Sequence, residues 1–191
     1  VGGSAGRLAQ GAMGVRTGPV AAQVELRWTG DVAAEDWMSV QNINGDVEVI
    51  VTNGSQIELV ATKRGDSGNF DLVQIEVVED RDGVSVCAIY PSRRRSETQD
   101  CGSQEFDRVR HRGDVDVEVT FELRVPSSTQ VKGTTVNGDV IVSGTLVNAV
   151  TTTVNGDVEV SSRGSLTATT VNGSVDARIE GSELAGPVTL T

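Results

Sequence analysis

The chain has 191 residues, of which 37% are hydrophobic and only 3% aromatic, and its formal net charge is −11. This negative charge argues against nucleic acid as a partner, because phosphate binding needs a positive field. No run approaches the ~20 apolar residues of a membrane-spanning helix, so direct membrane insertion is not expected.

The segment 1–22 is rich in glycine and has few charged residues, as in a flexible tail. Its apolar residues are scattered, at Leu8, Met13, Val15 and Val20. We predict a tail that contacts a neighbouring subunit. Because the chain begins at a valine and not at Met, we also expect a secreted protein whose signal peptide has been removed.

Alternating apolar residues indicate β-strands in the segment 23–191, which we expect to form one domain. Val47, Val49 and Val51 fall on one strand face. Residues 71–90 have the pattern of a hairpin that turns at an Asp- and Gly-rich segment. No segment from residue 129 onward is long enough to suggest a helix.

Two cysteines, Cys87 and Cys101, flank a polar segment. A metal site would need further ligands, and His111 is the only histidine, so we favour a disulfide that closes a polar loop at 87–113. Such a bond would stabilise the fold by roughly 3 kcal/mol and would indicate an oxidising compartment, outside the cytoplasm or exposed on the cell envelope.

Mixed charge fills the loop 91–113. Three consecutive arginines, Arg93, Arg94 and Arg95, are followed by interleaved acidic residues. The structural interpretation is a solvated loop, and the alternative is a docking patch for an acidic partner.

Four copies of one short phrase, a β-branched residue followed by Asn-Gly-Asp/Ser-Val, organise the chain. The last three copies are spaced by 18 and 17 residues, and a fixed period of this kind is typical of stacked repeats. The repeated turn residues are Asn44, Gly45, Asn137, Gly138, Asn155, Gly156, Asn172 and Gly173.

Two architectures fit this pattern. Asn-Gly between alternating strands is a strong hairpin signal and would suit an antiparallel meander. A meander does not require identical turn residues at fixed phase, whereas a solenoid places like residues above one another at ~4.8 Å. We therefore predict an all-β, single-stranded β-solenoid, similar to a β-helix, with coils of about 17–18 residues.

The turn phrase has a structural and a functional interpretation. Asn and Gly suit tight turns, and the following Asp can accept backbone hydrogen bonds. Calcium between stacked Asp139 and Asp157 is the alternative, but Ser174 replaces the third Asp, so few oxygens converge. We assign no metal, no cofactor and no catalytic residues, because no nucleophile, base or carboxylate pair is marked out.

The repeated Thr-Val-Asn-Gly-Asp-Val phrase, with Arg124-Val125-Pro126 before it and Val86-Cys87-Ala88-Ile89-Tyr90-Pro91 further upstream, resembles a bacterial family. This is the family of candidate adhesins and auto-transporter adhesin heads of the GIN-domain type. The resemblance covers about residues 38–191. It implies a secreted or envelope-exposed β-solenoid, and it brings no catalytic residues.

The end of the sequence is β-prone, with Val188 and Leu190, and shows no polar cap. A solenoid coil without a cap exposes backbone and apolar surface. We therefore expect a non-catalytic extracellular structural protein that self-associates head-to-tail, as in a filament, through its tail and terminal coil. The alternatives are a monomeric surface-binding module that uses loop 91–113 and, less favoured, a carbohydrate-active solenoid enzyme.

Overall fold

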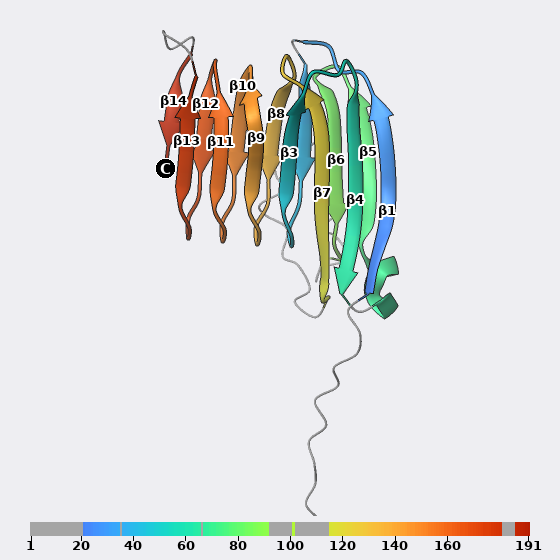
Figure 1. Cartoon of the computed structure of the whole chain (residues 1–191). Coiled ribbons are helices and arrows are strands. Elements are labelled where there is room, and N and C mark those ends of the chain that lie inside the picture. Colours follow the sequence, from blue (N-terminus) through green and yellow to red (C-terminus); the bar gives the residue numbers. More distant parts are fainter. Residues whose placement is uncertain (1–20, 35, 66, 92–100, 102–114, 181–185) are drawn as a thin grey trace, which may run out of the picture.

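The computed structural model describes residues 21–34, 36–65, 67–91, 101, 115–180 and 186–191 (Figure 1). The described residues form fourteen β-strands and one short 3-10 helix, with no α-helix among them. The elements are β1 (Ala21–Gly30), β2 (Trp37–Gln41), β3 (Val47–Thr52), β4 (Ile57–Gly65), η1 (Ser67–Leu72), β5 (Gln74–Asp80), β6 (Gly83–Ile89), β7 (Val117–Pro126), β8 (Gln130–Thr134), β9 (Val140–Leu146), β10 (Asn148–Thr152), β11 (Val158–Ser162), β12 (Leu166–Thr169), β13 (Val175–Ile179) and β14 (Val188–Leu190).

The strands form two seven-stranded sheets that face each other. One sheet has the order β1-β4-β7-β3-β9-β11-β13, and the other has the order β14-β12-β10-β8-β2-β6-β5. The sheets run side by side along the molecule, with β1 and β5 at one end and β13 and β14 at the other (Figure 1). Each sheet therefore has one edge strand at each end of the molecule.

Alternation in the sequence explains which face of each strand is buried. Along β7, Val119, Phe121 and Leu123 are buried between the sheets, whereas Glu118 and Glu122 face solvent. Successive side chains of a strand point to opposite faces, so this alternation places one apolar face on the core. The predicted hairpin at 71–90 is confirmed, because β5 and β6 pair antiparallel across a short turn.

The prediction of a single-stranded β-solenoid is wrong. Both sheets are mixed and they pack in a sandwich-like arrangement, with antiparallel pairs β1–β4, β4–β7 and β5–β6. The 17–18-residue repeat does not extend through residues 53–126, so nothing there imposes a regular coil. After the loop at Asn53-Gly54 the chain turns back as β4, and β7 then inserts between β4 and β3.

The repeated phrases do stack in parallel register, and in this respect an antiparallel meander is excluded. Single β-bridges join Asn44 to Asn137, Asn137 to Asn155, and Asn155 to Asn172. Around these turns β8, β10 and β12 pair in parallel, as do β9, β11 and β13. The first bridge joins residues that are 93 apart in the sequence. The turn at Asn44, Asn137, Asn155 or Asn172, together with the strand before it and the strand after it, is called a rung below.

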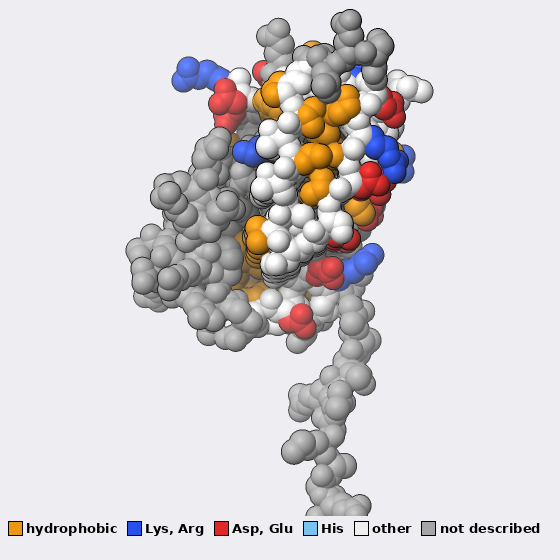
Figure 2. All heavy atoms as spheres, turned by 90° about the vertical axis from the view of Figure 1, so that its left-hand side faces the viewer, with side chains coloured by type: hydrophobic (Ala, Val, Ile, Leu, Met, Phe, Trp, Pro, Cys, Tyr) orange, Lys and Arg blue, Asp and Glu red, His pale blue; other side chains and the backbone are white. Residues whose placement is uncertain are grey.

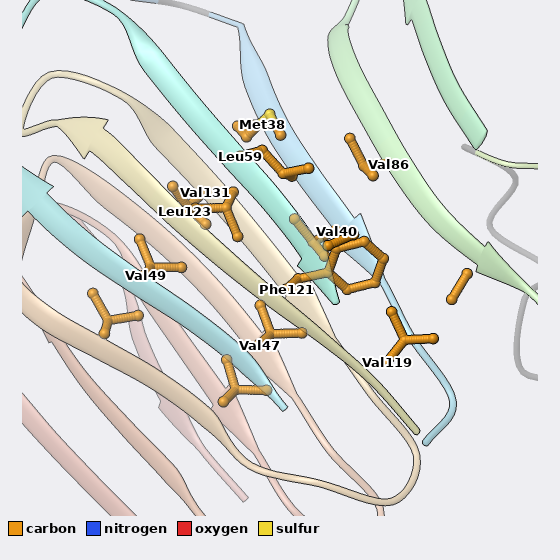
Figure 3. Packing of buried hydrophobic residues seen from close by; sticks show 14 of the residues in the cluster. Met38, Val40, Val47, Val49, Leu59, Val86, Val119, Phe121, Leu123 and Val131 are labelled. Carbon is orange, nitrogen blue, oxygen red and sulfur yellow. The ribbon is translucent and has the colours of Figure 1, made fainter. Parts of the chain in front are cut away.

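One continuous hydrophobic core lies between the sheets (Figure 3). Its members include Met38 and Val40 from β2, Leu59 from β4 and Phe121 from β7. The core also contains a buried cation, because the Lys63 ammonium donates to the carbonyl of Phe70 in η1 at 2.8 Å. The core also accommodates an aromatic ring, since Phe121 is fully buried.

Candidate functional site

The asparagines of the repeats form a ladder of side-chain hydrogen bonds. The Nδ2 of Asn137 donates to Oδ1 of Asn44 at 2.8 Å, and Asn155 and Asn172 each donate to the preceding asparagine at the same distance. Stacked amides on neighbouring parallel strands can bond in this way because like residues lie about one strand spacing apart. The repeated Asn is therefore required for the contact between rungs as well as for the turn.

A second ladder runs along the threonines. Thr135 Oγ1 donates to the carbonyl of Gly45 at 2.9 Å, and Thr153 and Thr170 make the equivalent bonds to Gly138 and Gly156 at 2.8 Å. In the first rung the buried Asn42 takes this place: its Nδ2 donates to Val119 O of the adjacent β7 at 2.6 Å and also to Gly45 O of its own rung at 2.9 Å. Each of the three later rungs thus satisfies a backbone carbonyl of the rung before it.

The Asp residues of the repeats serve the same purpose. Asp46 Oδ1 accepts the N–H of Asp139 at 2.8 Å, Asp139 accepts that of Asp157 at 2.7 Å, and Asp157 accepts that of Ser174 at 2.7 Å. One oxygen of each carboxylate is therefore committed to the backbone of the next rung. No group of three or more His, Cys, Asp or Glu side chains within the described ranges is placed to hold a metal ion.

The ladders lose their regular burial at the rung of β13. The equivalent valines Val136 and Val154 are half-buried, whereas Val171 is 69% exposed. Val140 and Val158 are fully buried, but Val175 is only half-buried. The difference arises because β3, β9 and β11 each lie between two strands of their sheet, whereas β13 has a neighbour on one side only among the described strands.

We define the open end as β13 together with β14, and it is the candidate functional site. Among the described strands, β13 pairs only with β11, and β14 pairs only with β12. Val188 and Leu190 are 38% and 53% exposed, although their neighbours Leu166 and Ala168 in β12 are buried. Figure 2 shows hydrophobic side chains gathered on this end of the molecule, with charged side chains at its margins.

A second feature lies on the outer face of the β2–β6 sheet, around the disulfide. Cys87 in β6 is bonded to Cys101, as predicted. Near it is an open depression of about 540 Å³. Its lining includes Trp37, Asp80, Arg81, Asp82 and Lys132.

Removal of this disulfide should destabilise the protein. The bond closes a loop with a sequence separation of 14, and the chain-entropy model gives about 3 kcal/mol for a loop of this size. Urea unfolding of the double variant Cys87→Ser/Cys101→Ser, compared with the oxidised parent, measures the effect. A change below about 0.5 kcal/mol would contradict the prediction.

Tyr90 is buried beside the first rung and joins two carbonyls. Its hydroxyl lies 3.1 Å from Asn44 O and 3.1 Å from Val117 O. Burial raises the pKa of the Tyr90 hydroxyl above its ordinary range. The folded protein therefore keeps this proton at pH values where the unfolded chain loses it.

Replacement of Tyr90 by Phe should cost about 1–2 kcal/mol at neutral pH, because the carbonyls of Asn44 and Val117 lose the one hydroxyl proton that they share. Because the pKa of Tyr90 is raised in the folded protein, its contribution to stability also depends on pH in a known direction. The stabilisation from Tyr90 is fully present below about pH 10, where the unfolded side chain is neutral, and declines as the pH rises above it. Unfolding measured between about pH 9 and 11 should show a smaller loss of stability with pH in Tyr90→Phe than in the parent. Equal slopes would contradict it.

Some of the predicted site residues lie in the described part of the structure, and others lie outside it. It brings together all eight Asn and Gly residues of the repeat turns, and it places Val188 and Leu190 on one exposed edge strand. Leu8, Met13, Val15 and Val20 lie outside the described residues, as does all of the loop 91–113 except Pro91 and Cys101. Their roles, and the division into tail and domain, stay predictions.

Two groups at this site were not predicted from the sequence. The first is the hydroxyl ladder of Thr135, Thr153 and Thr170, although the Thr-Thr-Val-Asn-Gly repeat was a signal for it. The second is Asp176 and Arg178 on β13, which form an exposed ion pair at 3.1 Å. No motif marks this pair, because its importance depends on β13 being an edge.

Comparison with known proteins gives only distant likeness. No protein-family model matches the sequence, and no curated protein matches it. The resemblance to the GIN-domain type therefore has no support from a family model. Within the described ranges, no helix has the length and apolar character that a membrane span would require.

Three solved structures match this chain, each at low identity and with a TM-score below 0.5. A candidate cell adhesion protein from Clostridium sporogenes is 9% identical, with a TM-score of 0.34, over 88% of this chain and 99% of its own. A candidate lipid binding protein from Parabacteroides distasonis is 13% identical, with a TM-score of 0.45, over 86% of this chain and 59% of its own. A candidate adhesin from Parabacteroides merdae is 9% identical, with a TM-score of 0.25, over 92% and 97%. At such values the likeness does not extend to function.

Proposed function

We propose that this chain is a non-catalytic, adhesin-like structural protein, extracellular or exposed on the cell envelope, that self-associates through its open end. The observation that carries the proposal is the open end, where the half-buried Val175 of β13 and the exposed Val188 and Leu190 of β14 present an apolar surface to solvent. Exposed edge strands present unpaired N–H and C=O groups, which are templates for pairing with another chain. The disulfide supports an oxidising location.

The ladders support a structural role over a catalytic one. Asp46, Asp139 and Asp157 each bind a backbone N–H of the next rung, which leaves them poorly suited to act as acid or base. The side chains that repeat most regularly therefore hold rungs together. A protein built in this way can be extended by adding another strand to either edge of its open end.

The direction of self-association separates two forms of the proposal. Head-to-tail contact, with the segment 1–22 as the intersubunit strand, repeats without closing and gives a filament. Contact between two like ends closes as a dimer. The segment 1–20 lies outside the described residues, so the argument for a specific contact rests on the open end alone.

The test is sedimentation velocity of the full chain with charges introduced at the open end. Val188→Lys/Leu190→Lys places two lysines on β14, where both side chains are already exposed, so the fold should tolerate them. The matched control is Ile50→Lys/Leu72→Lys, because these residues are 38% and 49% exposed and lie away from the open end. We expect concentration-dependent association in the parent and the control, and monomers in the β14 variant.

A parent chain that stays monomeric at every concentration would overturn this function. It would instead favour the second candidate, a monomeric binding module. The depression lined by Trp37, Arg81 and Lys132 supports that candidate, because it combines an aromatic face with polar and charged groups. The loop 91–113, which was expected to be a solvated loop and only alternatively a docking patch, lies outside the described residues except at Pro91 and Cys101.

A further inference from the structure

The pairing of β13 with β11 shows which backbone groups of β13 face the open edge. Ser174 O accepts a β11 amide at 2.9 Å, and the N–H of Glu180 donates to a β11 carbonyl at 2.9 Å. Along a strand, alternate residues direct both backbone groups to the same side. The N–H and C=O groups of Val175, Ala177 and Ile179 therefore point away from β11, toward the open edge.

The side chains of β13 divide by face. Val175, Ala177 and Ile179 point inward, are half-buried and pack against the core. Asp176 and Arg178 point outward, with side chains 59% and 63% exposed. An incoming strand must therefore match an apolar inner face and a charged outer face that carries one negative and one positive residue.

We propose that the partner of this edge is β13 of a second copy, paired antiparallel about Ala177. This inference rests on the proposed self-association and names its contact. In this register Ala177 lies opposite Ala177 of the second copy, and Val175 lies opposite Ile179. These are hydrogen-bonded pairs, because Val175, Ala177 and Ile179 are the residues whose N–H and C=O groups face the open edge. Asp176 then lies opposite Arg178 at a non-hydrogen-bonded pair, where side chains come closest.

Neighbouring registers are excluded by charge. If each strand shifts by one residue, the residues whose backbone groups face the open edge still pair with each other. The shift changes, however, which charged side chains lie opposite one another on the outer face. In one direction Asp176 meets Asp176 of the second copy, and in the other Arg178 meets its own copy while Asp176 meets Glu180. Like charges directly opposite on a sheet are destabilising. Of these three registers, only the one centred on Ala177 combines a paired backbone with opposite charges at both outward positions.

The same symmetry covers the apolar end of the core. A two-fold axis that runs from one sheet to the other, midway between the two facing Ala177 residues, keeps the inner face of β13 on the inner side in both copies. The half-buried Val175 and Ile179 then contact each other across the axis. The exposed Val188 and Leu190 of β14 belong to the same end, and the second copy brings its own β14 toward them. The contact is isologous and closes as a dimer.

The first experiment is a charge exchange on the full chain, measured by sedimentation equilibrium. Arg178→Asp and Asp176→Arg each place like charges opposite one another, and we expect the dissociation constant to rise about tenfold or more. The double variant Asp176→Arg/Arg178→Asp restores opposite charges with the order reversed, and its dissociation constant should return to within about threefold of the parent. Arg27→Asp, with the same change of charge at an exposed position of β1 at the other end of the molecule, should leave it unchanged.

The second experiment tests the register with single cysteines. In the pairing centred on Ala177, position 176 lies opposite position 178 of the second copy, at a separation that a disulfide can span. Two positions 176 lie diagonally, about 7–8 Å apart, which is beyond comfortable bridging. Mixed Asp176→Cys and Arg178→Cys proteins should therefore form a disulfide-linked dimer under mild oxidation, and neither variant should do so alone.

The outcomes separate this inference from the function on which it rests. A parent that never associates overturns both. A parent that associates, but with both single charge variants and the mixed cysteines behaving like controls, keeps self-association and overturns the β13 contact. Loss of association on deletion of residues 1–20, with the charge variants unaffected, assigns the contact to the tail and also overturns the inference.

Discussion

Replacement of Phe121 by alanine should lower the free energy of unfolding by about 3–5 kcal/mol. Phe121 is fully buried in β7 and is among the largest buried side chains. It projects into the space between the sheets (Figure 3). Its neighbours in register are Val47 on β3 and Ala61 on β4. The cavity would lie where the antiparallel and parallel parts of one sheet meet, so neither side can easily move to fill it.

The measurement is urea unfolding with the disulfide intact. Glu122→Ala is the matched control, because Glu122 follows Phe121 in the same strand but is exposed on the outer face. The control should change stability by less than about 0.5 kcal/mol. Similar values for the two variants would mean that the sheets close over the missing ring and that β7 is not a rigid part of the core.

Replacement of Gly45 by alanine should cost about 3 kcal/mol or more, the second large effect that we expect. Gly45 has φ +110°, a conformation that residues with a side chain rarely adopt. An added Cβ would also collide with the backbone carbonyl of Val119 in β7. That carbonyl accepts a hydrogen bond of 2.6 Å from the buried Asn42, so it cannot move freely.

The control is Gly54→Ala in the other Asn-Gly pair of the N-terminal half. Gly54 is exposed, and an added Cβ there would meet only Thr52 Oγ1, at 3.3 Å. Thermal unfolding should show a large fall in midpoint for Gly45→Ala and a small change for Gly54→Ala. Equal effects would indicate that the turn at Gly45 relaxes, and that the first rung does not depend on its close approach to β7.

The two Asn-Gly pairs show how far a motif can be interpreted alone. In the sequence, Asn44-Gly45 and Asn53-Gly54 look like two turns of one coil. In the structure Asn44 stacks on Asn137, whereas Gly54 lies in an exposed loop. The difference is the partner, since only the first pair has a rung beside it to accept its hydrogen bonds.

The features of the candidate site also differ in whether the sequence alone could predict them. The β-prone character of Val188 and Leu190 could be predicted, and so could the disulfide, because each depends on residue type and local spacing. The role of Asp176 and Arg178 could not. An alternating Val-Asp-Ala-Arg-Ile strand has the same pattern at the centre of a sheet as at its edge, and only the absence of a described neighbour on one side makes its charges relevant to a partner.

The sequence by itself determined the strands, through alternating valines, and the parallel stacking of the repeats, through Asn, Thr and Asp side chains that bond to their equivalents one rung away. Those contacts are local in the repeat, so a period of 17–18 residues is enough to specify them. The tertiary structure alone decided that the rung at Asn44 joins the one at Asn137, 93 residues later, and that β4 and β7 enter the sheet antiparallel. The physical reason is that the burial of Phe121, Leu59 and Ala61 between two sheets depends on contacts between segments that are distant in the sequence. A short sequence motif does not specify such contacts.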